Sequence, residues 1–188
     1  MLAQLRGAIV LTLIAMVVFG LGYSLVGTGV SQVLFPSQAH GSIGRDGSTL
    51  IGQRWTGPGW FHGRPDSDNP LAANGQPGSS GASNLGPRSK VLVEQTRGLI
   101  RYWQQQGVKP TADLVTTSGS GLDPDITPAD ALAQIPMVAR ATGLSASSLR
   151  RLIHSQTQGP ELGFLVPPYI DVLPLNLALY RLRRAGRG

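Results

Sequence analysis

The first part of the chain is almost wholly apolar. Nineteen uncharged residues run from Ala8 to Val26 (AIVLTLIAMVVFGLGYSLV), and as a helix they would extend roughly 28 Å at about 1.5 Å per residue. That length matches the hydrocarbon core of a bilayer. Weaker apolar character continues to Phe35. The pattern predicts an N-terminal transmembrane helix over residues 1–35 and one soluble domain over residues 36–188.

Three stretches of the soluble part combine helical periodicity with start or stop signals. The first covers about residues 88–106. The second begins at Thr127, which forms a variant of the capping box with Asp130, and the third begins at Ser145 and ends before Gly159. A further helical apolar pattern lies in residues 173–184. The predicted inward-facing residues are Leu92, Thr96, Leu99, Trp103, Leu132, Ile135, Ala139, Leu149, Leu152, Ile153, Leu175, Leu179 and Leu182.

Short apolar runs between these helices have the length of strands. They are residues 48–53, 113–117, 163–166 and 169–173. Helices on a small sheet predict an α+β fold, with one N-terminal transmembrane helix followed by a single small mixed α/β domain. Residues 66–87 contain almost no large apolar side chain and predict a flexible loop.

Charge around the apolar segment predicts its orientation. Arg6 precedes the segment, and the next basic residue is Arg45, so the short N-terminus is expected in the cytoplasm and the domain outside it, in the periplasm or its equivalent. A cleaved signal peptide is the alternative, because Ser37-Gln38-Ala39 has the pattern of a cleavage site. The apolar run exceeds the usual 7 to 15 residues of a signal peptide, which favours a retained anchor.

Composition narrows the function classes. The chain has 25 glycines, 14 prolines and no cysteine, which indicates many turns and excludes a disulfide framework or a thiolate metal site. The net charge of +6 reflects a basic C-terminus, because four arginines occupy the final eight residues. Without them 12 basic residues face 10 acidic ones. The tail is interpreted as a terminus facing solvent or lipid, and no nucleic-acid partner is expected.

A set of short motifs occurs in a fixed order along the chain. The most specific are Trp60–Pro65 (WFHGRP), Ser79–Pro87 (SSGASNLGP) and Ser118–Asp125 (SGSGLDPD). Shorter ones are Gly52-Gln53, Asp113–Thr116 (DLVT), Leu162–Phe164 (LGF), Asp171–Leu173 (DVL) and Leu175–Leu179 (LNLAL). Together they resemble the C subunit of the Kdp-type potassium-transporting P-type ATPases, over nearly the whole chain.

The resemblance implies a role in a bacterial inner-membrane complex, and no reaction of this chain's own. In that family a channel-like A subunit selects potassium, a P-type B subunit hydrolyses ATP with magnesium, and a small F subunit is present in some complexes. The C subunit is expected to assemble and stabilise them, with its domain over the external mouth of the A subunit and its helix in membrane lipid. The chain contains no DKTGT-like phosphorylation motif and no phosphate-binding P-loop pattern.

Two alternative functions stay open. The family has also been assigned a catalytic chaperone role in which the C subunit binds ATP, and Ser118–Gly121 has the glycine-rich character of an anion-binding loop. An external domain would not meet cellular ATP, so tight turns are the favoured interpretation. The other alternative is a membrane-anchored periplasmic hydrolase that uses Ser118, Asp123 or His62. Ser118 lacks a nearby histidine in sequence, which weakens it as a nucleophile.

The candidate site residues fall into two groups. Close packing of a partner helix is expected at Gly20, Gly22, Gly27 and Gly29, because small residues let helices approach in lipid. Motif residues expected at an interface or a nucleotide contact are Gln53, Phe61, His62, Gly63, Arg64, Ser83, Asn84, Ser118, Gly119, Ser120, Gly121 and Asp123. No catalytic residue is assigned. No metal site is expected, because the three histidines are scattered. The carboxylates of Asp123 and Asp125 are expected to orient a turn or to form a pair that attracts potassium. Arg64 is expected to form an ion pair with a partner or with Asp66.

Overall fold

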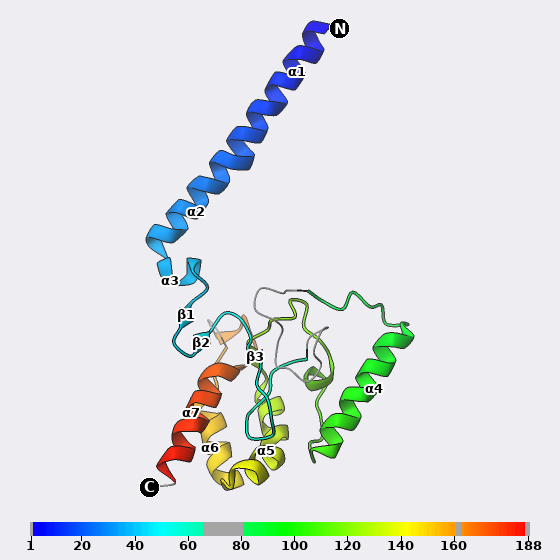
Figure 1. Cartoon of the computed structure of the whole chain (residues 1–188), viewed down its shortest axis with the longest axis vertical. Helices are drawn as coiled ribbons and strands as arrows, with labels where there is room; N and C mark the ends of the chain where they lie inside the picture. The colour runs from blue at the N-terminus through cyan, green and yellow to red at the C-terminus, as the bar shows by residue number, and fades with distance from the viewer. Residues whose placement is uncertain (1, 66–80, 161–162, 187–188) are drawn as a thin grey trace. The chain divides into compact units, whose positions relative to one another are not determined.

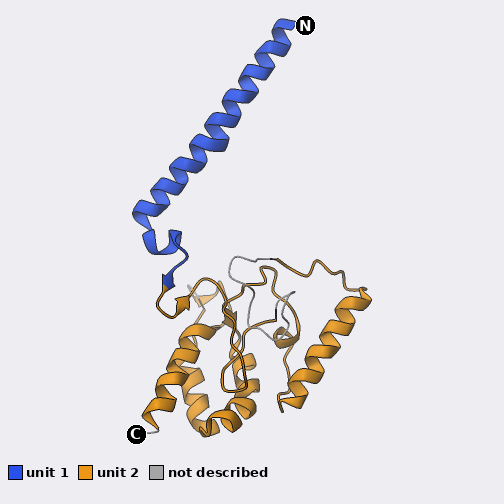
Figure 2. Cartoon of the chain, viewed as in Figure 1, with its two compact units in different colours: residues 1–43 blue, residues 44–188 orange. Residues whose placement is uncertain are grey.

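The computed structural model describes residues 2–65, 81–160 and 163–186. It divides into two compact units, unit 1 (Met1–Ile43) and unit 2 (Gly44–Gly188), which are coloured separately in Figure 2. The predicted loop 66–87 lies mostly outside the described residues, which resume at Gly81.

Unit 1 is a long apolar helix. The segments α1 (Leu2–Ala15), the π-helical η1 (Met16–Gly22) and α2 (Tyr23–Leu34) follow one another without a break, and α3 (Pro36–Ala39) comes after Phe35. None of α1, η1 or α2 contains a buried residue. The 33 residues Leu2–Leu34 are long and apolar enough to cross a membrane. The predicted helix is confirmed and extends beyond Ala8–Val26 at both ends.

Unit 2 contains the four predicted helices, which Figure 1 shows as α4 (Lys90–Gln105), α5 (Pro128–Thr142), α6 (Ala146–Gln156) and α7 (Val172–Ala185). Each begins with a side chain that accepts a hydrogen bond from a backbone N–H of the first turn, which satisfies a donor that the helix leaves unpaired. The four capping residues are Ser89, Thr127, Ser145 and Asp171. The box predicted between Thr127 and Asp130 is present in both directions.

Two small sheets complete the α+β fold. Strands β1 (Ile43–Gly44) and β2 (Gly47–Ser48) form one, while β3 (Asp125–Ile126) and β4 (Ile170–Asp171) pair antiparallel in the other. In the second sheet Asp125 lies opposite Asp171. The sheet therefore joins the residues before α5 to those before α7.

The strand predictions were largely wrong, because local side-chain and turn hydrogen bonds replace sheet pairing. Residues 113–117 form a 3-10 turn, η2 (Asp113–Val115), and the Leu114 carbonyl accepts a bond from Trp103 Nε1 at 2.8 Å. Of residues 48–53 only Ser48 is in a strand, and Leu50 N donates to the Ser48 hydroxyl instead of to another strand. Residues 163–166 lie in a turn, and in 169–173 the strand is limited to Ile170–Asp171.

The core of unit 2 is formed by apolar side chains from all four helices and the loops between them. Helix α5 packs against α6, and α6 packs against α7. The prediction for Leu132 was wrong, because it is 40% exposed whereas its neighbour Ala131 is fully buried. Large core residues are Phe61, Leu99, Trp103, Leu114, Ile135, Met137, Val138, Leu149, Ile153, Ile170, Leu175 and Leu179.

Candidate functional site

The motif Trp60–Pro65 is held by two buried amide side chains. Asn176 of α7 accepts a bond from Phe61 N and donates one to Phe61 O, both at 2.9 Å. Gln134 of α5 accepts from His62 N at 2.8 Å and donates to His62 O at 2.9 Å. Both amides are fully buried. They therefore supply the backbone pairing that a neighbouring strand would provide.

Sequence reasoning named neither amide as a site residue, although Asn176 lies in the motif LNLAL. Gln134 and Asn176 are single polar residues on otherwise apolar helix faces, in ALAQIPMV and LPLNLAL. An isolated amide at a core position is a signal of a buried hydrogen-bond partner, because burying it unpaired costs free energy. The backbone of Phe61 and His62 is thus hydrogen-bonded to the core of unit 2.

His62 is buried inside the fold, at 2% exposure. Its Nε2 lies 3.0 Å from the carbonyl oxygen of Gly57, an acceptor that requires a proton on Nε2. Its ring meets Trp103 edge-on, with 5.8 Å between centroids. Burial lowers the pKa of His62, which favours the neutral ring. This environment fixes a tautomer in the core and gives no open access to a substrate.

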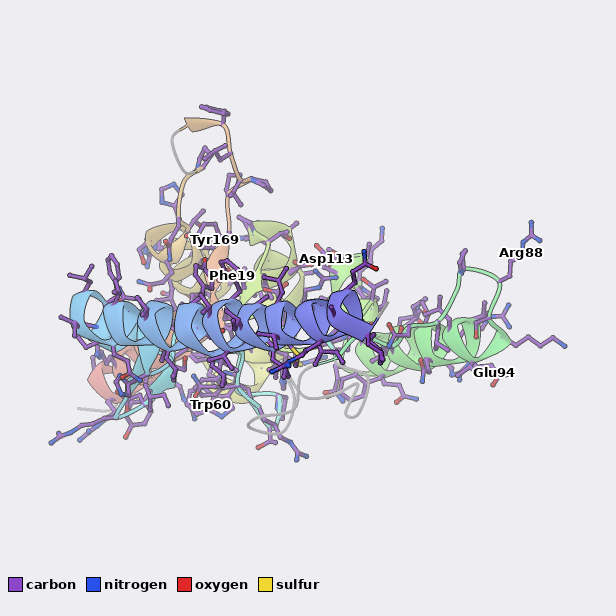
Figure 3. The ribbon with its side chains drawn as sticks, turned by 90° about the horizontal axis from the view of Figure 1, so that it is seen from above. Phe19, Trp60, Arg88, Glu94, Asp113 and Tyr169 are labelled. Carbon is purple, nitrogen blue, oxygen red and sulfur yellow. The ribbon has the colours of Figure 1, made fainter. Side chains whose placement is uncertain are left out.

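Trp60 and Trp55 connect the motif to the C-terminal helix. Their ring centroids are 5.1 Å apart, and the Arg183 guanidinium of α7 lies 5.6 Å from the centre of the Trp60 ring. Trp60 is labelled in Figure 3. Arg184 lies 5.9 Å from the ring of Tyr180. Two arginines of the basic tail are therefore engaged with aromatic rings of unit 2 by cation–π contacts.

Arg64 joins the same motif to the loop before α5. Its Nη1 lies 3.4 Å from Asp123 Oδ2, and its Nη2 lies 3.3 Å from the carbonyl oxygen of Thr117 and 3.9 Å from Asp113 Oδ1. The structure thus brings Arg64 and Asp123 together as an ion pair within the chain. The alternative partner Asp66 lies outside the described residues.

A cavity of about 380 Å³ opens beside this ion pair. Its lining includes Arg64, Asp113, Asp123, Asp125 and Tyr169. Burial, and then the nearby charges of Asp171 and Asp123, raise the pKa of Asp125 to about 6. The lining thus combines an arginine with several aspartates, and the raised pKa favours the protonated form of Asp125 more than at an exposed aspartate.

Asp130 contributes little free charge to that cavity. Its carboxylate accepts bonds from the N–H and the hydroxyl of Thr127, at 2.8 and 2.6 Å, and from the hydroxyl of Thr111. Asp123 also accepts from Asp125 N at 3.1 Å. In the part of the chain that the structure describes, no group of three histidine, cysteine or acidic residues has the arrangement of a metal site.

The loop SGSG is closed by its own serine side chains. Gly121 N donates to Ser118 Oγ at 2.9 Å, and Leu122 N donates to Ser120 Oγ at 3.1 Å. Gly121 has a φ of +68°, and a Cβ there would lie 2.5 Å from the carbonyl oxygen of Gly81. Gly81 N binds the Ser120 carbonyl at 2.8 Å. These contacts support the interpretation of Ser118–Gly121 as a tight turn, since the N–H groups of Gly121 and Leu122 already donate to the loop's own serines.

Three further motif residues shape the backbone. Gln53 Nε2 donates to the carbonyl oxygen of Ser48 at 2.9 Å. Asn84 has a φ of +52°, a left-handed conformation that asparagine tolerates better than most residues. The hydroxyl of Ser83 accepts from Leu85 N at 3.5 Å. Gly63 is buried and Gly119 is exposed, so the motif residues do not gather at one pocket.

The candidate glycines of unit 1 lie on two faces of the helix. Residues seven apart are two turns apart on one side of a helix, whereas residues two apart point in nearly opposite directions. Gly20 and Gly27 therefore share one side, and Gly22 and Gly29 share the other. Ser24 lies near the first pair, and its hydroxyl donates to Gly20 O at 2.6 Å. Small residues on either side permit close packing of a neighbouring helix.

Known proteins match this chain over nearly its full length. The family model for the K⁺-transporting ATPase c chain, KdpC, matches residues 5–181. A "Potassium-transporting ATPase KdpC subunit" of Gloeobacter violaceus is 45% identical, with 97% of this chain and 98% of the relative covered. A protein of the same name from Sorangium cellulosum is also 45% identical, over 95% of this chain and 98% of its own length. The third, from Methylorubrum extorquens, is 45% identical over 98% of this chain and its full length.

The family model covers residues of both units, and every motif that carried the initial resemblance lies within the range 5–181 that it matches. The chain belongs to the KdpC family, the c chains of K⁺-transporting ATPases.

Proposed function

We propose that this chain is the non-catalytic subunit that assembles and stabilises a potassium-transporting ATPase. Its proposed partners are the channel-like A subunit, the P-type B subunit and, where present, the small F subunit. The observation that carries this proposal is the helix Leu2–Leu34, which is long and apolar enough to cross a membrane and of which no residue is buried. Such a surface requires lipid or another membrane helix around it.

The proposed orientation follows from charge. Arg6 precedes the uncharged segment Ala8–Val26 and no basic residue occurs again before Arg45, so the N-terminus is assigned to the cytoplasm. Unit 2 then lies on the external side of the membrane. This position suits a subunit that contacts the outer mouth of a potassium channel.

The hydrogen bonds of the motifs support a role without catalysis. Ser118 bonds to Gly121 N and lies 3.4 Å from the Ser120 hydroxyl, so its hydroxyl contributes to a turn. His62 is buried against Trp103. A hydrolase would need a nucleophile, a base and an oxyanion site in one open pocket, and these residues have other roles. ATP and magnesium are therefore proposed to act in the B subunit.

Cysteine labelling tests the orientation, because the chain has no cysteine of its own. Gln104→Cys places a thiol on the exposed surface of α4, and Gln4→Cys places one before the uncharged segment Ala8–Val26. In intact cells a membrane-impermeant maleimide should label Gln104→Cys and leave Gln4→Cys unlabelled until the membrane is opened. The reverse pattern would place unit 2 in the cytoplasm and revive the ATP-binding alternative.

A further inference from the structure

Two aspartates lie opposite each other across the sheet formed by β3 and β4. In its register Asp125 pairs with Asp171, and in the next pair Val172 N donates to Pro124 O at 3.0 Å. Hydrogen-bonded and non-hydrogen-bonded pairs alternate along an antiparallel ladder. Asp125 and Asp171 therefore form a non-hydrogen-bonded pair, in which the two side chains project from the same face and lie closer together than in a hydrogen-bonded pair.

Neither carboxylate of this pair has a basic partner among the described residues. Arg64, which lines the cavity beside Asp125, is paired with Asp123 at 3.4 Å. Asp171 is only 7% exposed, and its Oδ1 accepts a bond from Leu173 N at 2.9 Å. Like charges directly opposite each other destabilise a sheet, and burial adds to the cost of the charged forms. The sheet is therefore most stable when one of the two carboxyls carries a proton.

The other charged groups around the sheet leave this repulsion in place. Asp113 and Asp130 line the same cavity, and the Tyr169 hydroxyl there donates to a glutamine. Helices α6 and α7 also pack against β4. The basic residues of α6 are exposed, and those of α7 begin ten residues after Asp171, about 15 Å along the helix. The basic residues of the two helices are Arg150, Arg151, His154, Arg181, Arg183 and Arg184.

Asp125 is the member of the pair that takes up the proton. Burial, and then the charges of Asp171 and Asp123, raise its pKa to about 6. Burial also raises the pKa of Asp171, but the bond from Leu173 N works against that increase. Asp171 caps α7, and a helix N-terminus favours a negative charge at its cap. The ionised form is thus better supported at Asp171 than at Asp125.

We propose that β3 and β4 form a pH-sensitive clasp, which is closed when Asp125 holds a proton and loosens when Asp125 and Asp171 are both ionised. β3 ends directly before Thr127, the cap of α5, and β4 ends at the cap of α7. The clasp therefore joins the first turns of these two helices. Each strand has only two residues, so few backbone hydrogen bonds oppose the repulsion. The inference concerns contacts within unit 2 and does not rest on the proposed function.

Hydrogen exchange of the full-length chain in detergent tests the clasp. Mass spectrometry follows peptides that cover β3, β4 and the centre of α5 at pH 5, 6 and 7.5, and each rate is corrected for the intrinsic rate at that pH. With a pKa of about 6 when the clasp is closed and about 4 when it is open, the open form is about tenfold more populated at pH 7.5 than at pH 5. The protection of β3 and β4 should fall by about that factor. At pH 7.5 it should also lie about tenfold or more below the protection of α5, because the clasp opens without unfolding the core.

Two variants and a control identify the groups responsible. Asp125→Asn should remove the pH dependence and keep the sheet as protected at pH 7.5 as the unmodified chain is at pH 5. Asp171→Asn should reduce the dependence, because asparagine still caps α7 but carries no charge. Asp46→Asn, at an exposed position, should leave it unchanged.

Three results would overturn the inference. The first is protection of β3 and β4 that is the same at pH 5 and pH 7.5. The second is a pH dependence that persists in full in Asp125→Asn. The third is equal protection of the sheet and of α5 at pH 7.5, because the sheet would then open only when the whole of unit 2 unfolds.

Discussion

The two units of this protein treat apolar side chains in opposite ways. In unit 1 none of the 33 residues from Leu2 to Leu34 is buried within the chain. In unit 2 residues such as Phe61, Leu114 and Leu179 are completely buried. Unit 2 thus provides its own apolar interior, whereas unit 1 needs lipid or a partner to supply one. Substitutions inside unit 2 should therefore change stability, and substitutions in unit 1 should change assembly.

The largest effect on stability is expected from Gln134→Leu in unit 2. Leucine fills a similar volume but leaves the N–H and C=O of His62 unpaired in the core. The loss should lower the free energy of unfolding by about 3 kcal/mol. Urea unfolding of the detergent-solubilised chain, followed by tryptophan fluorescence, measures it. Gln105→Leu on the exposed side of α4 is the control and should change stability by less than about 0.5 kcal/mol. Equal losses of stability from Gln134→Leu and Gln105→Leu would contradict the claim that Gln134 stabilises the fold by pairing with the backbone of His62.

A smaller loss is expected from Gly121→Ala. The glycine has a φ of +68°, and a Cβ would approach the Gly81 carbonyl oxygen to 2.5 Å. The strain and the displaced loop contact should cost about 2 kcal/mol. Gly119→Ala, two residues earlier, meets no atom within 4 Å of the added Cβ and should be nearly neutral. Tolerance of both changes in the same urea assay would contradict the tight-turn interpretation of SGSG.

Asp125→Asn should stabilise unit 2 at neutral pH. The pKa of Asp125 is raised to about 6 in the folded protein by burial and by Asp171 and Asp123. The folded state therefore holds the proton more tightly than the unfolded state does. As the pH rises from about 4 to about 6, ionisation of Asp125 lowers the stability of the folded state, and the full loss remains above that range. The gain at pH 7.5 should be about 1 kcal/mol, reduced by partial solvent access, and should vanish near pH 4. Asp46→Asn, at an exposed position, is the control. A gain that does not depend on pH would contradict the electrostatic cause.

The smallest effect on the folding of unit 2 is expected from Gly27→Leu in unit 1, because a Cβ at Gly27 meets no atom of the chain within 4 Å. The substitution should leave the urea midpoint of unit 2 unchanged and still reduce recovery of partner subunits severalfold, because leucine blocks close helix packing. Gly7→Leu is the matched control, since Gly7 also has an open surround and lies outside the candidate glycines. If Gly27→Leu changed the stability of unit 2 and left the recovery of partner subunits unchanged, the proposed difference between the two units would be contradicted.

The sequence predicted the helices of both units well. Apolar periodicity and capping residues such as Thr127 and Ser145 depend on neighbours a few residues away, so their signals are local. Strands were predicted poorly. Residues 113–117 have the apolar content of a strand, but the Leu114 carbonyl pairs with the side chain of Trp103, a contact that no local pattern reveals.

Contacts between residues far apart in the sequence also limited what could be predicted of the site. The motif WFHGRP was recognised, yet its buried partners Gln134 and Asn176 lie 72 and 115 residues away along the chain. The ion pair between Arg64 and Asp123 spans 59 residues. Which polar groups meet in the core depends on how the helices pack, and single-sequence patterns do not contain that information.

Co-purification through an affinity tag on this chain, followed by an ATPase assay, tests the central claim most directly. We expect the tagged chain to recover a P-type ATPase and a channel-like membrane protein, and the preparation to hydrolyse ATP faster when potassium is added. Gly27→Leu should lower the recovery of both proteins relative to Gly7→Leu. Recovery of the chain alone from cells that express the whole transporter, with no potassium-stimulated hydrolysis, would contradict it.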